Sequence, residues 1–592
     1  MEKRQFTRAA RCAACCALSV VLAASLGGCA AASAASSSDA ASVSDVAVAS
    51  AVNGTAAADD LGAYDLEYSK RDLDASYDAT QATYIALADG ASSAETYTHG
   101  SADGVSVSGN DVTITQAGTY VLSGSLTDGC VFVNIDKEEK CQLVLNGVSI
   151  SNGDGPCIYV TAADKTFITL ADGTENTLVD GADYVLDEDE EPTATIFSKD
   201  DLTLNGTGAL NITGNYRHAV RSKDDLIITG GTYVISAVED ALNGKDCLKI
   251  CGGAFDITCG EDALKSSNDS EEGRGFVAID GGDFTISAGD DTVHAETLMR
   301  ITDGTVNVLT CYEGYEGAAV RIDGGTTSIV ASDDGINAAS GSSSEGDVPM
   351  GSGAAEGDGG RGGAGGPGAG GAGAGDAGAG GPSAPGDAGS DADAGAPGDA
   401  GGAVASSTCK VVVTGGTTYV SAGGDGIDSN GSVEVSGGML MVEGPTSNAD
   451  SFFDYDSSAT ITGGTVLMVG STGMAQSFTG GTQAFAMASA SGSAGQTVIL
   501  QDAQGNEVAS FAATKNFQAV LASADGAAEG DTLTVKIGST ETALTASTTA
   551  TTSGFGVGGG RGGDRGGDMA AGAPGAGGGT PGSDSGVSGN RS

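Results

Sequence analysis

Three stretches decide the fold of this chain: Ser198-Lys-Asp-Asp-Leu202, Ser222-Lys-Asp-Asp-Leu226 and Gly244-Lys-Asp-Cys-Leu248. They are copies of one turn, and each is followed by a short apolar strand and a glycine turn. The double-glycine turns recur about every 22 residues, with longer intervals where the chain carries insertions. They begin at Gly230, Gly252, Gly281, Gly324, Gly415, Gly437 and Gly463. Repetition at a fixed period is typical of architectures that stack one small unit many times.

The repeat unit predicts an all-β fold. Each unit holds three short strands, such as Leu248-Lys-Ile250 and Ala254-Phe-Asp-Ile257. A period near 22 with three strands fits one coil of a right-handed parallel β-helix, a solenoid whose coils stack at about 4.8 Å. Leucine-rich repeats have a similar length but lack these glycine turns. We therefore predict a parallel β-helix over residues 104–495 and a small C-terminal β cap over 496–546.

The first residues predict export. A basic start and a short apolar stretch end in Leu26-Gly27-Gly28-Cys29, which resembles the bacterial lipobox. Residues 1–28 are then a signal peptide, and Cys29 is acylated at the extracellular face of the cell membrane. An ordinary signal peptide or an uncleaved anchor are the alternatives. Residues 29–60 are Ala/Ser-rich and predict a flexible tether, followed by an approach segment over 61–103.

Two further segments lack any strand pattern. Residues 341–406 and 547–592 are rich in glycine, alanine and aspartate, so we predict a disordered insertion and a disordered tail. The net charge of −52 excludes nucleic acid as a partner, because phosphate contacts need lysine and arginine. The eight cysteines after Cys29 form no Cys-x-x-Cys pair, which argues against a structural zinc site and leaves their pairing open. These are Cys130, Cys141, Cys157, Cys247, Cys251, Cys259, Cys311 and Cys409.

Acidic residues recur in the turn after the third strand of each unit. Superposing the units aligns Asp240, Asp262, Asp291, Asp334 and Asp425, and four of these follow another acid, namely Glu239, Glu261, Asp290 and Asp333. Stacked carboxylates about 5 Å apart repel by roughly 3 kcal/mol at an effective dielectric constant of about 20. Calcium binds six to eight oxygens in flexible geometry and would relieve this repulsion. The row therefore predicts a calcium site, and a merely solvated acidic edge is the alternative.

One unit before Asp240 is cationic. It reads Asn215-Tyr-Arg-His-Ala-Val-Arg221, so that Tyr216, Arg217 and Arg221 neighbour the acidic row. Arginine pairs well with carboxylates, and the unit could hold a sugar acid. A local salt bridge to Glu239 or Asp240 is the alternative.

The turns, the repeated "Asp-Asp-Gly-Ile" steps and the opening Asp111-Val-Thr-Ile-Thr-Gln-Ala-Gly-Thr-Tyr-Val-Leu-Ser-Gly-Ser-Leu-Thr-Asp-Gly129 together resemble the bacterial carbohydrate-binding domain-containing proteins. The resemblance runs from about Gly104 to Ala546. It implies a calcium-containing, pectate-lyase-like β-helix that binds polysaccharide, uronate-rich or cellulose-like, with Asp240, Asp262, Asp291, Asp334 and Asp425 as the matching acidic turns. The chain has no tryptophan, the usual flat platform for sugars.

Three functions remain open at this stage. The first is non-catalytic polysaccharide binding at the cell surface, which we expect. The second is a structural or adhesive surface protein. The third is a polysaccharide lyase in which an arginine removes a proton beside bound calcium. A single mixed arginine and histidine unit is weak evidence for an assembled active site, so we expect no enzyme.

Overall fold

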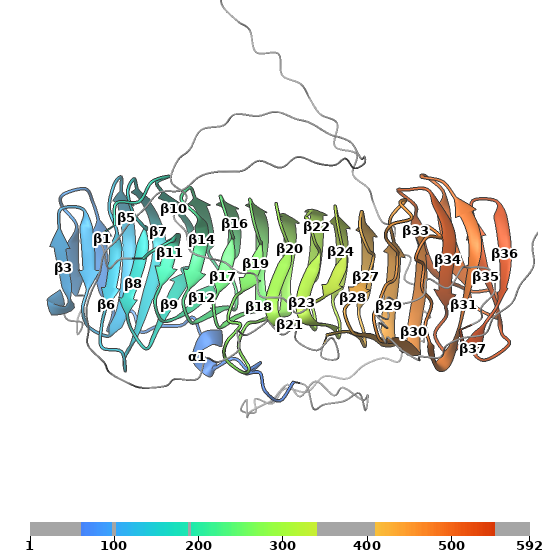
Figure 1. Ribbon diagram of the computed structural model, residues 1–592. Helices are drawn as coiled ribbons and strands as arrows, with labels where there is room; N and C mark the ends of the chain where they lie inside the picture. Colours follow the sequence, from blue (N-terminus) through green and yellow to red (C-terminus); the bar gives the residue numbers. More distant parts are fainter. Residues whose placement is uncertain (1–60, 97–101, 187–190, 340–408, 551–592) are drawn as a thin grey trace, which may run out of the picture. The chain divides into compact units, whose positions relative to one another are not determined.

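The computed structural model describes residues 61–96, 102–186, 191–339 and 409–550 (Figure 1). Cys29, the leader, the tether, the insertion at 341–406 and the tail beyond residue 550 lie outside these residues, so what we expect of them stays a prediction. The described chain is all-β apart from α1 (Lys70–Leu73) and the 3₁₀ turn η2 (Ala102–Gly104). Neither of these two elements is long or apolar enough to cross a membrane.

The body is one sheet of 33 strands, most of them paired in parallel. Strands adjacent in the chain rarely pair with each other there; each pairs with a strand two or three places further on, as in β11–β14–β17. The strands fall into three rows, and the first row carries the acidic turns. It consists of β4 (Asp111–Ile114), β6 (Val131–Asn134), β8 (Ile158–Ala162), β11 (Ala194–Ser198), β14 (His218–Ser222), β17 (Leu242–Gly244), β19 (Leu264–Ser266), β21 (Val293–Ile301), β23 (Tyr315–Ile322), β25 (Ile336–Ala338) and β28 (Asp428–Ser429).

The other two rows share several long strands. The second row contains β1 (Thr83–Leu87), β5 (Gly118–Leu126), β7 (Lys140–Asn152), β9 (Lys165–Leu170), β12 (Asp201–Gly206), β15 (Asp225–Ile228), β18 (Cys247–Cys259), β20 (Phe276–Ser287), the second halves of β21 and β23, β26 (Lys410–Val413), β29 (Ser432–Glu443) and β30 (Ser458–Gly470). The third row adds β10 (Glu175–Asp180), β13 (Ala209–Gly214), β16 (Thr232–Ala237), β22 (Thr305–Thr310), β24 (Thr326–Ala331) and β27 (Thr417–Ala422) to the second halves of the long strands.

The expected fold class, a right-handed parallel β-helix of uniform three-strand coils with a separate cap, is wrong as stated. Strands β18, β20, β29 and β30 are 12 or 13 residues long and continue through the glycine turns that we took as strand ends. The second glycine of such a turn, for example Gly253 at φ +117°, allows a bend that shifts the register of the pairing without ending the strand. These glycine pairs therefore mark bends within strands, whereas those that begin at Gly230, Gly324 and Gly415 separate two strands as predicted.

Antiparallel pairs at both ends also depart from the expectation. At one end β1 pairs with β2 (Ser93–Thr96) and β4 with β3 (Val105–Ser108), so the sheet begins inside the presumed approach segment. At the other end β34 (Phe517–Ser523) pairs with β30 and β31 (Gly480–Gly492), and β37 (Ser547–Thr549) pairs with β31. A separate antiparallel sheet is limited to β32 (Thr497–Gln501), β33 (Glu507–Ala512), β35 (Thr532–Ile537) and β36 (Thr540–Thr545).

The main core is a continuous stack of Ile, Leu and Val side chains that runs along the sheet. No disulfide joins any of the eight cysteines of the described residues, and all but Cys251 are buried. Residues 61–76, which we call the N-terminal strap, lie against the second row. Lys249 donates hydrogen bonds to the carbonyls of Asp65 and Glu67, and Asp72 forms a buried ion pair of 2.8 Å with Lys165. The strap therefore covers polar side chains that would otherwise lie on an open face of the sheet.

Candidate functional site

The acidic turns form a column along the edge of the first row, as the superposed units predict. We call it the inner column. Its members are His218, Asp240, Asp262, Asp291, Glu313, Asp334, Asp425 and Ser451. The carbonyl of each residue from Asp240 onward accepts a hydrogen bond from the residue that follows the preceding member. Because the strands are parallel and in register, equivalent turn residues lie one strand spacing apart.

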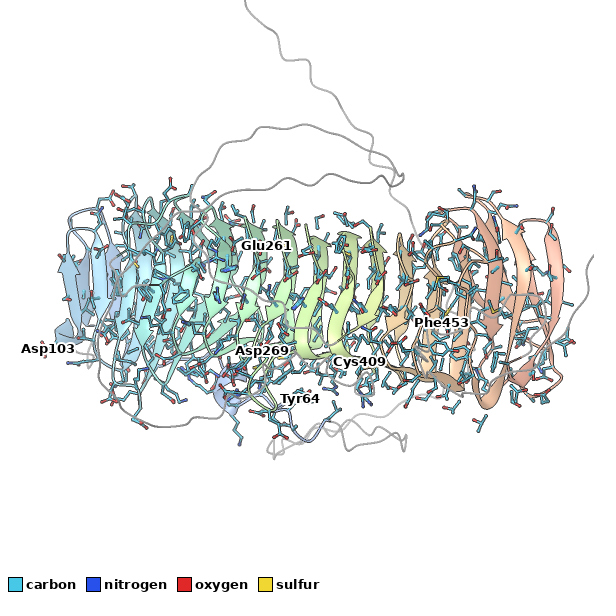
Figure 2. The ribbon with its side chains drawn as sticks, in the orientation of Figure 1. Tyr64, Asp103, Glu261, Asp269, Cys409 and Phe453 are labelled. Carbon is cyan, nitrogen blue, oxygen red and sulfur yellow. The ribbon has the colours of Figure 1, made fainter. Side chains whose placement is uncertain are left out.

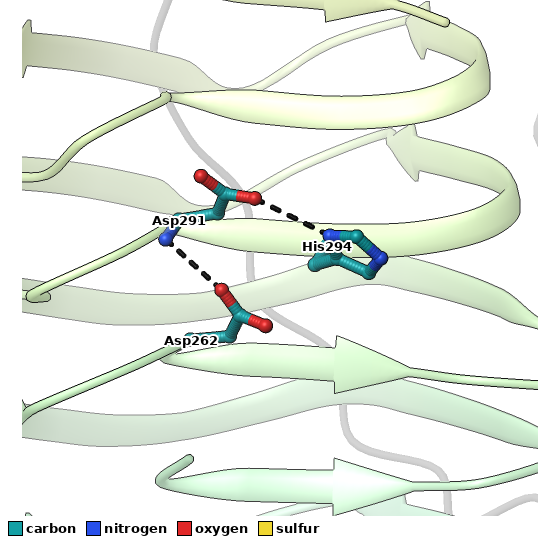
Figure 3. Close-up of side chains that lie close together, drawn as sticks. All are labelled: Asp262, Asp291 and His294. Atoms are coloured by element: carbon teal, nitrogen blue, oxygen red, sulfur yellow. Dashed lines mark hydrogen bonds and ion pairs between the residues drawn. The ribbon is translucent and has the colours of Figure 1, made fainter. Parts of the chain in front are cut away.

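The inner carboxylates hold neighbouring turns together. Oδ1 of Asp262 accepts a hydrogen bond of 3.0 Å from the backbone N–H of Asp291, and Asp291 does the same for Glu313 at 3.2 Å (Figure 3). Asp334 accepts from the N–H of Asp425 at 2.6 Å. Each of these carboxylates thus satisfies a backbone donor of the next turn and keeps its other oxygen for a second partner.

A second column lies three residues further on, at positions that face away from the core. We call it the lateral column, and it consists of Arg221, Asn243, Lys265, His294, Glu316, Asn337 and Asp428. The local sequence explains the spacing. An inner acid is followed by a small residue such as Ala241, then by a fully buried apolar residue such as Leu242, and then by the lateral residue.

In the first half of the columns, lateral side chains neutralise the inner acids. Lys265 lies 2.9 Å from Asp262 and 3.9 Å from Asp240, and all three are buried. Asn243 donates to Asp240 at 2.7 Å, and Nδ1 of His218 lies 3.2 Å from the same carboxylate. Burial alone would raise the pKa of Asp240, but His218, Lys265 and Asn243 more than offset it and lower the pKa.

His294 occupies the middle of the lateral column. Its Nδ1 lies 3.3 Å from Asp291 (Figure 3). The same atom lies 2.5 Å from Glu316, and Nε2 lies 3.7 Å from Glu296. Burial alone would lower the pKa of His294, but these three carboxylates raise it to about 12. Burial raises the pKa of Asp291 to about 8, with repulsion from Asp262 and Glu316 adding to the effect. The imidazolium therefore supplies the positive charge at this level of the columns.

The far end of the columns has no such cation among the described residues. Oxygen atoms of Asp334, Asp425 and Asp428 lie within 4.8 Å of one another. Burial, with repulsion from neighbouring carboxylates adding to it, raises the pKa of Asp425 and of Asp428 to about 7 and that of Asp334 to about 6. Asn337 lies three residues after Asp334 and pairs in register with Asp428, so it adjoins this cluster.

Asn337 also provides an independent sign of an incomplete site. Its Nδ2 donates to Glu313 at 2.9 Å, which fixes the orientation of the amide, while its buried Oδ1 has no hydrogen-bond partner in the described part of the chain. An amide oxygen and three carboxylates are the oxygen donors that calcium prefers. The residues present therefore fit a calcium ion. We refer to Asp334, Asn337, Asp425 and Asp428 as the oxygen cluster.

Three other acids predicted as metal ligands are Glu239, Glu261 and Asp290. They are not among the described residues whose ligand atoms lie close enough together to share one metal ion. Glu239 forms an ion pair with Nε of Arg217 at 2.5 Å. Burial and the charges of Asp240 and Glu239 raise the pKa of Glu261 to about 7, and its side chain lies at the edge of the turn (Figure 2). Asp290 is exposed. These three acids form an outer row beside the inner column.

The cationic unit is largely engaged within the protein. Arg217 is held by Glu239, which is the local salt bridge that we considered as the alternative. Nη1 of Arg221 lies 3.1 Å from Nε2 of His218 and 3.4 Å from Thr193, while its Nε is buried without a partner among the described residues. Tyr216 stacks on Tyr184 with ring centroids 4.1 Å apart. The unit is compact, and Arg221 has no carboxylate partner among the described residues.

Sequence reasoning missed Asn337 and Asp428. The signal that could have found them is the repeated four-residue step of acid, small residue, large apolar residue and polar residue, as in Asp334-Gly-Ile-Asn337 and Asp425-Gly-Ile-Asp428.

Comparison with known proteins supports the resemblance noted in the sequence. Residues 108–359 match the family model described as "Carbohydrate-binding domain-containing protein". A protein of that description from Acetivibrio thermocellus is 39% identical over 137 residues, which cover 23% of this chain and 48% of the relative. The chain thus spans about half the length of this relative. A solved structure described as a polysaccharide lyase-like protein from C. thermocellum, gadolinium derivative, is 34% identical, covers 41% of this chain and 93% of its own, and has a TM-score of 0.36.

Proposed function

We propose that this chain, whose residues 108–359 match the model of the carbohydrate-binding domain-containing protein family, binds polysaccharide without cleaving it. The family match is the observation that carries the proposal. Lipidation at Cys29 would hold the protein at the extracellular face of the cell membrane, where polysaccharides are accessible.

The state of the two arginines supports binding over cleavage. A lyase needs a group that accepts a proton from the sugar beside a bound cation. Arg217 donates to Glu239, and Arg221 lies against His218 and Thr193. The adjacent carboxylate of Asp240 is fully buried and already has His218 and Asn243 as partners. Arg217, Arg221 and Asp240 are therefore in contact with other side chains of the protein itself.

We further propose that the oxygen cluster holds calcium in a structural role. Asp334, Asp425 and Asp428 would supply carboxylate oxygens, and Asn337 its amide oxygen. The ion would neutralise carboxylates contributed by two successive turns. These turns flank residues 341–406, so the ion would join the first row across the insertion, where β25 and β28 pair directly.

A glycan array probed with the full chain in calcium and in EDTA tests the function. We expect polysaccharide binding in calcium. Binding should be weaker in EDTA if the ion at the oxygen cluster fixes turns that belong to the sugar-binding surface. Absence of binding to every glycan under both conditions would favour a structural or adhesive protein. Release of unsaturated uronate products from polygalacturonate would contradict the non-catalytic proposal.

A further inference from the structure

A cavity of about 470 Å³ is lined by the turns that precede β4, β6 and β8, together with Val185, Leu186 and Pro192. Figure 1 shows β6 and β8 well separated along the sheet from β28, which carries Asp428 of the oxygen cluster. The whole cavity lies within the part of the chain that matches the family. It belongs to neither column of charged residues described above.

Carboxylates on two successive turns face this cavity. Oδ1 of Asp111 accepts a hydrogen bond of 3.0 Å from the N–H of Cys130, and Oδ1 of Asp128 accepts one of 3.0 Å from Gly153. These backbone bonds fix both carboxylates in place. Their Oδ2 atoms have no hydrogen-bond partner among the described residues, and Asp128 is exposed. Fixed, accessible carboxylate oxygens are strong acceptors for sugar hydroxyls.

Aromatic and apolar groups complete the lining. Phe132 is half-buried and lies 5.9 Å from the ring of Tyr159, and both line the cavity. Val185 is 76% exposed at the rim. The cavity thus combines polar groups with an aromatic ring, and an aromatic ring packs against the C–H face of a sugar.

The charge of the cavity selects the class of sugar. Asp111, Asp128 and Asp154 line it, and none of the described residues that line it is Lys, Arg or His. Behind its aromatic wall, Nζ of Lys199 lies 5.9 Å from the centre of the Tyr159 ring and 3.9 Å from Glu191. A uronate carboxylate would be repelled here, whereas a neutral hydroxylated ring would not.

We propose that this cavity binds an uncharged sugar unit of a polysaccharide. The Phe132 ring would pack against the sugar face, and Asp111 and Asp128 would accept hydrogen bonds from its hydroxyl groups. The proposal rests on the proposed function and assigns to it a position and a ligand class. The oxygen cluster then has a structural task, and sugar recognition lies at the other end of the first row.

Calorimetric titration of the full chain in calcium tests this, with hexasaccharides of glucose, mannose, xylose and galacturonate as probes. We expect at least one neutral hexamer to bind and the galacturonate hexamer to bind at least tenfold more weakly. Asp128→Asn retains the oxygen that accepts from Gly153 but loses the charge, and should weaken neutral binding about tenfold, the loss expected for one charge-assisted hydrogen bond. Asp111→Asn is a second variant of the same kind.

Asp89→Asn is the matched control. Asp89 likewise accepts a hydrogen bond of 2.8 Å from the N–H of Thr127, but it does not line the cavity. The Asp89→Asn variant should therefore bind the neutral hexamer with the affinity of wild type. If wild type binds a neutral hexamer and both cavity variants bind it equally well, the cavity assignment is wrong while the proposed function stands. If galacturonate binds best and the cavity variants weaken it, the ligand class is wrong. If no glycan binds in the array or the titration, the proposed function fails as well.

Discussion

The two halves of the paired columns are built from the same four-residue step and differ in the charge of the fourth residue. Around Asp240 and Asp262 the fourth residue is an amide or a lysine, and the buried carboxylates have partners within the protein. Around Asp425 the fourth residue is Asp428, and burial raises the pKa of both to about 7. Asp262, whose fourth residue is Lys265, is therefore neutralised within the protein, whereas Asp425, whose fourth residue is a second carboxylate, is available for a cation.

The largest expected effect lies in the neutralised half. Lys265→Met should destabilise the protein by about 3–5 kcal/mol, the range measured when one partner of a buried ion pair is removed. The physical reason is that Asp262 and Asp240 would both lose a buried cation. Chemical denaturation followed by circular dichroism measures the change.

The control for this substitution is Lys140→Met. Lys140 pairs with Asp164 at 2.5 Å, but the two side chains are 55% and 44% exposed, so the expected change is below about 1 kcal/mol. Equal effects of the two substitutions would mean that burial does not govern the value of these pairs, and the contrast between the two halves would lose its basis.

The next effect concerns calcium. Calcium should stabilise wild type by about 2–3 kcal/mol at about 100 times its dissociation constant, and magnesium should do so less, because magnesium requires near-octahedral geometry. Asp425→Asn combined with Asp428→Asn should abolish the shift. Thermal melts in calcium, magnesium and EDTA measure it.

The Glu261→Gln variant distinguishes two models, one with calcium bound only at the oxygen cluster and one with calcium bound along the whole acidic row. Glu261 was predicted as a ligand from the sequence, but it lies outside the oxygen cluster, so this variant should keep the full calcium shift. Loss of the shift in Glu261→Gln, with retention in the double variant, would place the ion in the other half.

The inner column could be predicted from the sequence because one residue per repeat suffices to align the units. Its chemistry could not, because the partner of each acid belongs to another position and often to another turn. Asn337 and Asp428 are in register although the insertion separates them in the chain. The glycine turns misled for a different reason: a residue with positive φ bends a strand as readily as it ends one, and the hydrogen bonding that distinguishes the two is non-local. The strap was also beyond sequence reasoning, since Asp72 meets Lys165 through the fold alone.

A smaller effect should appear on changing pH in EDTA. Asp425 and Asp428 have folded pKa values near 7, above the value of about 4 in an unfolded chain. Protonation thus favours the folded state, and this contribution is lost as pH rises through about 7. Wild type should lose stability between pH 5 and pH 8 relative to the Asp425→Asn, Asp428→Asn double variant.

With calcium bound, the sign should reverse for these two carboxylates. The ion favours the ionised form, so acidification from pH 8 to pH 5 should release it and lower the melting temperature. Melts of both proteins at the two pH values, with and without calcium, provide the four differences. Parallel pH responses of wild type and the double variant in EDTA would show that the two carboxylates titrate alike in the folded and unfolded chain.

The smallest expected effect comes from giving the far end of the columns the lateral lysine of the first half. Asp428→Lys places a lysine three residues after Asp425, as Lys265 stands three residues after Asp262. In EDTA this should stabilise the protein by up to about 1 kcal/mol, since the cluster is only partly buried and the new pair is screened by solvent. The variant should also lose its response to calcium, because the ammonium group takes the place of the ion. Asp428→Asn is the companion substitution: it removes one repelling charge without adding a cation, and should give a smaller gain. If the lysine variant is no more stable than wild type in EDTA, the identity of the lateral residue does not decide how the inner carboxylates are satisfied.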